Sequence, residues 1–236
     1  MNYIDLAKTF WDQGYLLLED FFSVELSEKY HQLILDHFGY NPEFCHNEEF
    51  LKKSATEVIP WFPQHEGVNA FDEGENDPRL FLLTEAILGE GWRSLYCMSM
   101  YSKPNSKGQA WHQDCPPEDT SQFNMNRLMY THHITDIIGG QVLVVPGSHR
   151  RGAITAGKVD EDLHDQLVIF PQQGTLLLIH GHTWHRVLPV KDHYRVSTNY
   201  RCMPKGVPEN VTDVCVYRNM RYRFETNSVV EDRTVI

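Results

Sequence analysis

Residues 166–202, QLVIFPQQGTLLLIHGHTWHRVLPVKDHYRVSTNYRC, form a succession of short apolar runs separated by turn-forming residues. Strands are expected at 166–170, 175–180, 187–190 and 194–202. Breakers such as Pro171–Gly174 lie between these runs, and no helical segment intervenes. Strand after strand without intervening helices indicates an antiparallel sandwich or barrel and not a parallel sheet.

The same pattern of short apolar runs separated by turn-forming residues extends upstream to Trp92. Further strands are expected at 95–101, 127–135 and 141–145, with turns at Gly139-Gly140 and Pro146-Gly147. Residues 92–236 are therefore predicted to form a mainly β core. The sequence shows no internal repeat and no second domain.

Residues 1–91 differ in character. Apolar residues at helical spacing predict a first helix that Gly14 ends, followed by a short buried strand at Tyr15–Leu18. A second helix is expected to begin after Ser23, which can cap it, and a third to span Pro78–Leu88. The β core is thus expected to carry flanking helices.

Residues 41–79 form a long irregular segment rich in Pro, Gly, Asn and Glu. Long loops inside a compact chain commonly cover functional sites. We therefore predict a single domain covering residues 1–236, in which residues 1–91 supply helical support and an active-site cover and residues 92–236 form the core.

Composition excludes several classes of partner. The formal charge of −11 and the pI near 5.6 argue against nucleic acid, because phosphate binding needs a basic face. No apolar run approaches the roughly 20 residues of a membrane helix, and the amino terminus does not resemble a secretory signal. The five cysteines are scattered and form no CxxC pair. Free thiols in a reducing compartment are the simplest account, so a cytoplasmic location is expected.

The tetrapeptide Trp111-His112-Gln113-Asp114 is the first candidate for chemistry. In an extended strand, residues two apart point to the same side, so His112 and Asp114 can direct an imidazole and a carboxylate at one point. A second histidine from a distant strand would complete a face of two histidines and one carboxylate. Such a face leaves positions on ferrous iron open for a co-substrate and dioxygen.

The second histidine is expected just after the strand at 175–180. The candidates are His180, His182, His185 and His193. His180 and His182 share a side only if the strand continues past Gly181. His193 falls in an expected hairpin turn.

The strand at 194–202 adds a second polar feature. Alternation places four polar residues on one face: Arg195, Ser197, Asn199 and Arg201. Polar side chains facing an apolar core need a wet or ligand-filled lumen, whereas an exposed edge strand would need none. A guanidinium binds a carboxylate through two parallel bonds, so Arg195 with Ser197 is suited to the distal carboxylate of 2-oxoglutarate.

In this order and spacing, the motifs resemble the phytanoyl-CoA dioxygenase family of double-stranded β-helix (jelly-roll, cupin-like) oxygenases. The matching pieces are Phe10–Tyr15, Trp111–Asp114, Gly139–Arg150, and Gly174–Arg186 with Arg195. The resemblance implies that His112, Asp114 and His185 hold Fe(II) and that Arg195 binds 2-oxoglutarate. His185 is favoured because it matches the family's distal position before Arg186, and His182 is kept as the alternative. Lys103 lies where relatives often carry a lysine near the co-substrate.

The implied activity is oxidation of a small molecule by dioxygen, with 2-oxoglutarate converted to succinate and carbon dioxide. Asp114 favours hydroxylation of an unactivated C–H bond, because halogenating relatives replace this carboxylate with a small residue. The substrate is expected to be polar or anionic, and the oligomeric state is left open. Candidate pocket linings are Trp61, Phe62, Phe71, Arg127, Tyr130, His132, Asn199 and Arg201.

Two other readings of the sequence are kept. Two histidines and a carboxylate also make a catalytic zinc site, so a zinc-dependent hydrolase is one alternative, although no HExxH helix is present. A catalytically inactive jelly-roll binding protein is the other, since a fold does not by itself imply chemistry.

Overall fold

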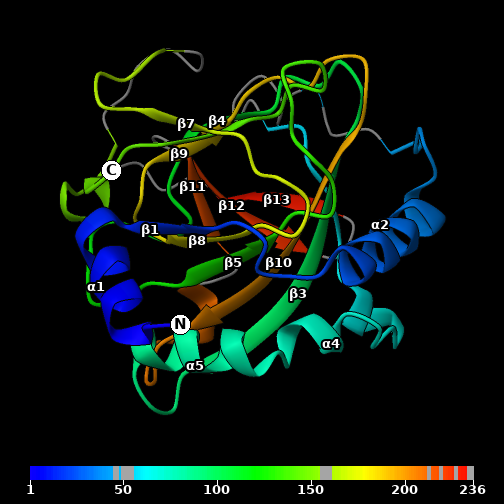
Figure 1. Ribbon diagram of the computed structural model, residues 1–236. Helices are drawn as coiled ribbons and strands as arrows, with labels where there is room; N and C mark the ends of the chain where they lie inside the picture. Colours follow the sequence, from blue (N-terminus) through cyan, green and yellow to red (C-terminus); the bar gives the residue numbers. More distant parts are fainter. Residues whose placement is uncertain are drawn as a thin grey trace.

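The computed structural model of the protein describes residues 1–44, 48, 56–154, 161–211, 214–217, 220–225 and 228–232. Two antiparallel sheets form separate layers (Figure 1). The larger sheet has the order β1 (Tyr15–Leu18), β8 (Leu176–His180), β5 (Met125–Met129), β10 (Arg195–Met203), β3 (Arg93–Ser102) and β2 (Ile59–Trp61). The smaller sheet has the order β4 (Gln109–His112), β9 (His185–Val187), β6 (Val142–Val144) and β7 (Leu167–Ile169).

Helices cover the outer face of the larger sheet (Figure 1). They are α1 (Tyr3–Gln13), α2 (Val24–Phe38), α4 (Asp72–Glu75) and α5 (Pro78–Leu88). Side-chain oxygens of Asn2, Ser23 and Asp77 accept backbone N–H groups in the first turns of the three longer helices. Each cap satisfies a donor that the helix itself leaves without a partner. A third sheet consists of β11 (Val214–Tyr217), β12 (Met220–Glu225) and β13 (Ser228–Asp232).

Alternation along β8 explains its continuous apolar sequence. Leu176 and Leu178 pack into the core beneath the helices, while Leu177 and Ile179 pack into the core between the two sheets. A strand buried on both faces needs apolar residues at every position. The predicted mainly β class with flanking helices is confirmed, and the two layers form the jelly-roll core.

Several strand boundaries differ from the predictions. The strand expected at 127–135 ends at Met129, so His132 and His133 lie outside it. The strand expected at 187–190 begins earlier, at His185. Short strands β2 and β4, and the third sheet, were not predicted.

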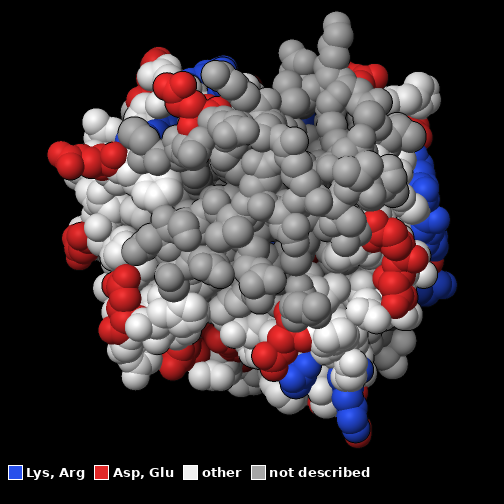
Figure 2. All heavy atoms as spheres, turned by 180° about the vertical axis from the view of Figure 1, so that it is seen from behind, with Lys and Arg blue, Asp and Glu red and all other residues white. Residues whose placement is uncertain are grey.

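The chain has a formal net charge of −11. On the face shown in Figure 2, acidic side chains are distributed around the periphery, and basic ones form smaller groups near the edges. Across the part of the chain that the structure describes, no helix is both long and apolar enough to span a membrane.

Candidate metal centre and its cavity

The pairing of β4 with β9 brings two histidines together. His112 and His185 are directly opposite each other in this antiparallel pair, and their ring centroids are 4.1 Å apart. Asp114 follows β4 by two residues, and its backbone N–H donates to the Gly181 carbonyl at 2.7 Å. That bond holds Asp114 against the turn between β8 and β9. The positions of the three side chains are thus set by β4, by β9 and by this turn.

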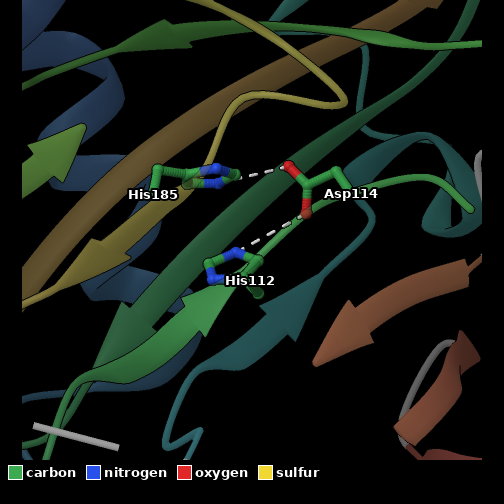
Figure 3. Close-up of side chains that lie close together, drawn as sticks. All are labelled: His112, Asp114 and His185. Atoms are coloured by element: carbon green, nitrogen blue, oxygen red, sulfur yellow. Dashed lines mark ion pairs between the residues drawn. The ribbon is translucent and has the colours of Figure 1, made fainter. Parts of the chain in front are cut away.

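The three side chains converge (Figure 3). His112 Nε2 lies 3.6 Å from one carboxylate oxygen of Asp114, Oδ1, and His185 Nε2 lies 3.4 Å from the other, Oδ2. One potential ligand atom from each residue lies within 4.8 Å of the other two, and all three residues are buried. A cluster of this composition and spacing is suited to one divalent metal ion.

Hydrogen bonds to the backbone orient both imidazoles in the same way. His112 Nδ1 donates to the Ala110 carbonyl at 2.9 Å, and His185 Nδ1 donates to the Thr183 carbonyl at 2.8 Å. A carbonyl can only accept, so the proton of a neutral ring is on Nδ1 and the lone pair is on Nε2. Metal-binding histidines are commonly held by such bonds.

Polar neighbours hold the Asp114 carboxylate. Asn126 Nδ2 donates to Oδ2 at 2.6 Å, and Arg201 Nη2 lies 3.3 Å from the same oxygen. Burial favours the neutral acid, but the Arg201 guanidinium and then His185 outweigh it, so the pKa of Asp114 lies well below its usual value.

The neighbouring His112 is held in its neutral form. Burial, and then repulsion from His185, lowers the pKa of His112 to about 3. A neutral imidazole beside an ionised carboxylate is the protonation state that metal ligation requires. The donor set therefore fits a ferrous ion in charge, donor type and number.

The metal cluster and Arg195 line the same cavity. Its described wall consists of Val58, Met98, Met100, Gln109, His112, Asp114, Asn126, Leu128, Tyr130, Val142, Ile179, His185, Val187, Arg195, Asn199 and Arg201. Arg195 is buried, its Nε donates to the Gly140 carbonyl at 2.8 Å, and its Nη2 donates to the Tyr130 hydroxyl at 3.2 Å. A Cβ on Gly140 would lie 2.4 Å from Arg195 Cδ, so only glycine leaves room for this arginine.

Comparison with known families matches residues 10–191 to the phytanoyl-CoA dioxygenase (PhyH) family. The chain belongs to this family. The resemblance predicted from the sequence motifs is thereby confirmed. No curated protein sequence matches the chain significantly.

Solved structures similar to this PhyH-family chain share its fold. One is the non-heme alpha ketoglutarate dependent epimerase SnoN from nogalamycin biosynthesis, with a TM-score of 0.67 and 16% identity over 92% of this chain and 85% of that one. Another is HygX from Streptomyces hygroscopicus with nickel and 2-oxoglutarate bound, with a TM-score of 0.68 and 15% identity over 87% of this chain and 88% of that one. At these identities the likeness establishes the jelly-roll fold alone.

The alternative ligand, His182, lies outside the cluster. Its Nδ1 is 3.4 Å from Cys115 Sγ, and its Nε2 is 3.2 Å from the Gln122 carbonyl. Both ring nitrogens thus have partners other than the three candidate metal ligands.

Two predicted co-substrate residues, Lys103 and Ser197, are absent from the described cavity wall. Lys103 is in the turn that follows β3. Ser197 is fully buried on β10, and its hydroxyl has no hydrogen-bond partner among the described residues. A buried hydroxyl without a partner is unfavourable, and it lies two residues from Arg195 on the same strand. This orphaned group fits the expectation of a bound carboxylate nearby.

Some of the residues expected to line the substrate pocket line the cavity, and others lie elsewhere. Tyr130, Asn199 and Arg201 line the cavity as predicted. The expected linings that lie elsewhere are Trp61, Phe62, Phe71, Arg127 and His132. Trp61 and Phe71 pack in the core beneath the helices, and the buried Arg127 forms an ion pair with the partly exposed Glu75. Residues 45–47 and 49–55 of the expected cover segment, residues 41–79, lie outside the described residues; among the described ones, Val58 lines the cavity.

Sequence reasoning missed Asn126, which bonds the candidate metal ligand Asp114. Asn126 and Leu128 line the cavity, and they alternate with Met125, Arg127 and Met129, of which the two methionines pack under the helices. Because the buried Arg127 is a second polar residue on the same strand, the sequence pattern did not single out Asn126 as the residue that faces the cavity.

Proposed function

We propose that the protein is an Fe(II)- and 2-oxoglutarate-dependent dioxygenase that hydroxylates a small-molecule substrate at an unactivated C–H bond. One observation carries the proposal: His112, Asp114 and His185 share a cavity with the buried guanidinium of Arg195. Membership of the phytanoyl-CoA dioxygenase family supports the reaction class. A zinc hydrolase would not require a buried arginine in this position.

Bound ferrous iron, with 2-oxoglutarate and dioxygen, supplies an oxidant strong enough to attack an unactivated C–H bond, and it releases succinate and carbon dioxide. The chain's own residues bind and orient the reactants. His112, Asp114 and His185 would hold the ion, leaving three of six octahedral positions for the co-substrate and dioxygen. Because all three protein ligands are provided by buried, hydrogen-bonded side chains, the cluster is rigid before any metal binds.

Arg195 would bind the distal carboxylate of 2-oxoglutarate. Its Nε and one Nη are held by the Gly140 carbonyl and the Tyr130 hydroxyl, which fixes the plane of the guanidinium. A fixed guanidinium loses little conformational entropy when it binds a carboxylate. Lys103 and Ser197 stay predicted contributors to co-substrate binding.

Apolar residues make up much of the remaining wall. Examples are Met98, Leu128 and Ile179. Such walls exclude water from the reacting atoms and strengthen the interactions inside the cavity. A small organic molecule, polar or anionic in part, is the proposed substrate. SnoN is described as an epimerase. The test must therefore distinguish hydroxylation from removal of hydrogen without addition of a hydroxyl group.

The proposal is tested by measuring succinate release from purified protein supplied with Fe(II), 2-oxoglutarate and air. We expect Asp114→Ala to abolish succinate release because it removes a metal ligand. We expect Arg195→Ala to raise the 2-oxoglutarate concentration required for half-maximal rate by at least about tenfold, since a charge-assisted hydrogen bond contributes roughly 1.5–3 kcal/mol. The iron requirement should change much less.

The exposed Arg150 provides a matched control, and Arg150→Ala should leave both requirements unchanged. Succinate release by Asp114→Ala at the wild-type rate would contradict the ligand assignment. Equal effects of Arg195→Ala on both requirements would contradict the role of that arginine. Mass spectrometry of products from a metabolite library then distinguishes an added oxygen atom from an inverted stereocentre.

A further inference from the structure

A second buried asparagine, Asn199, lies beside Asn126 in the cavity wall. In the pairing of β10 with β5, Asn199 is opposite Leu128, so Asn126 is its diagonal neighbour on the adjacent strand. Side chains at diagonal positions on one face of a sheet are close enough to interact. Asn199 Nδ2 donates to Asn126 Oδ1 at 2.7 Å, and Asn126 Nδ2 donates to Asp114 Oδ2 at 2.6 Å. The two amides thus connect β10 to a candidate metal ligand.

The direction of these hydrogen bonds is set at the end farthest from Asp114. The backbone N–H of Arg127 donates to Asn199 Oδ1 at 3.1 Å. A backbone N–H can only donate, so the oxygen of the Asn199 amide must face it and the nitrogen must face Asn126. The Asn126 oxygen accepts that bond, which leaves the Asn126 nitrogen to donate to the Asp114 carboxylate. Each bond is thus specified by the one before it.

The opposite orientation of the Asn126 amide would lose all of its bonds. Its oxygen would face the Asp114 carboxylate, which is also an acceptor, and its nitrogen would face the donors of Asn199 and Arg201. Arg201 Nη2 donates to the same Asn126 oxygen at 2.6 Å. Buried polar groups that face like groups are strongly unfavourable. Both donors therefore favour the observed orientation, and Asn199 is in turn fixed by a backbone group.

We propose that Asn199 is a positioning residue: by fixing the amide orientation of Asn126, it holds the Asp114 carboxylate in the direction required to bind the metal ion. Asn199 acts through Asn126 and not by contact with the ion. Groups that orient a metal ligand change its affinity for the ion even though they make no bond to it. This inference rests on the proposed function, because it concerns the ion that Asp114 would bind with His112 and His185.

The test is a double-mutant cycle in which each apoprotein is titrated with Fe(II) by calorimetry in the absence of dioxygen. Asn199→Leu keeps the approximate size of the side chain and removes both of its hydrogen bonds. We expect it to weaken Fe(II) binding by about fivefold, the effect of one neutral hydrogen bond on an equilibrium. In protein that already carries Asn126→Ala, the same substitution should weaken binding by less than about twofold, because the group through which Asn199 acts is gone.

Thr198→Val is the matched control. Thr198 is the neighbouring residue on β10, it is also buried, and its hydroxyl lies 3.5 Å from that of Ser99, so this substitution likewise removes a buried polar contact. It should leave the Fe(II) affinity unchanged. Unfolding midpoints of all variants separate an effect on metal binding from an effect on folding. If Asn199→Leu does not fold, Asn199→Ser replaces it, because the smaller side chain is accommodated and is too short to reach Asn126.

The outcomes are distinct. A folded Asn199 variant with wild-type Fe(II) affinity would overturn this inference and leave the proposed function intact. Equal losses of affinity with and without Asn126, or an equal loss in Thr198→Val, would also overturn it, since the effect would then not pass through Asn126. A wild-type protein that binds no Fe(II), or whose Fe(II) complex gives no visible charge-transfer band with 2-oxoglutarate, would overturn the proposed function, and the inference with it.

Discussion

At the scale of single residues, the two oxygens of Asp114 have different surroundings. Oδ2 accepts from Asn126 and lies beside Arg201, whereas Oδ1 faces His112. Polar groups around a metal-binding carboxylate fix its orientation and tune its affinity. The site therefore depends on Asn126 almost as directly as on the candidate ligands themselves.

We expect Asn126→Ala to weaken metal binding by about 10–100-fold, the usual range for loss of a group that orients a metal ligand. The measurement is titration of the apoprotein with Fe(II) under anaerobic conditions. The unfolding midpoint, measured in parallel, verifies that the variant is folded. A folded variant with wild-type metal affinity would contradict the role given to this asparagine.

At the scale of elements, the sequence predicted the longer strands β8 and β10 closely and the short strands β4 and β9 poorly. The run of leucines in β8 was found, because burial on both sides demands apolar residues throughout. Gln109–His112 was not recognised as β4, since two of its four residues line the cavity and are polar. For the same reason, β9 was predicted to begin after His185 instead of at it.

The candidate site was predictable to the extent that ligand types and spacing define it. His112 and Asp114 are close in sequence, so alternation alone placed them together. His185 and Arg195 needed the family resemblance, because the register that sets His185 opposite His112 depends on sheet pairing between distant segments. Asn126 could not be assigned a partner from sequence for the same reason. The reading of β10 as an exposed edge strand is wrong, because it lies between β5 and β3 and is buried throughout.

An ion pair joins the short helix α4 to the larger sheet. Arg127 on β5 is fully buried, its Nη2 donates to Glu75 at 2.9 Å, and its Nε donates to the Tyr200 carbonyl at 2.8 Å. We expect Glu75→Gln to lower the free energy of unfolding by about 2 kcal/mol, because it leaves the buried guanidinium without its counter-charge.

The measurement is urea unfolding, and the matched control is on the same helix. Glu73 pairs with Lys29 at the surface, so Glu73→Gln should change the free energy of unfolding little. A double variant, Glu75→Gln with Arg127→Met, should recover part of the loss, since no buried charge is left. Equal free energies of unfolding for the Glu75→Gln and Glu73→Gln variants would show that the ion pair with Arg127 does not stabilise the fold.

At the scale of the whole molecule, burial keeps several imidazoles in their neutral form. Burial, and then repulsion from His31 and Arg195, lowers the pKa of His132 to about 3. Burial, followed by repulsion from His182, also holds the pKa of His180 well below its usual value. In the unfolded chain, both imidazoles would bind protons near pH 6.5. Between the lowered pKa of each folded-state histidine and about pH 6.5, the unfolded state therefore binds more protons than the folded state.

Stability should consequently fall as the pH falls below about 6.5, and the His132 contribution should continue to fall to about pH 3. For this residue alone, the loss from about pH 7 to about pH 5 is on the order of 1–2 kcal/mol. Urea unfolding of His132→Gln should show a shallower dependence on pH than that of the wild type. Identical slopes for wild type and His132→Gln would contradict this account.

The claim on which the whole account depends is that His112, Asp114 and His185 hold ferrous iron together with 2-oxoglutarate. Anaerobic addition of Fe(II) and 2-oxoglutarate, followed by visible absorption, tests it most directly. We predict a charge-transfer band that requires both components, that disappears in His185→Ala, and that persists in His182→Ala. A band that survives in His185→Ala and is lost in His182→Ala, or a wild-type protein that shows no band, would contradict it.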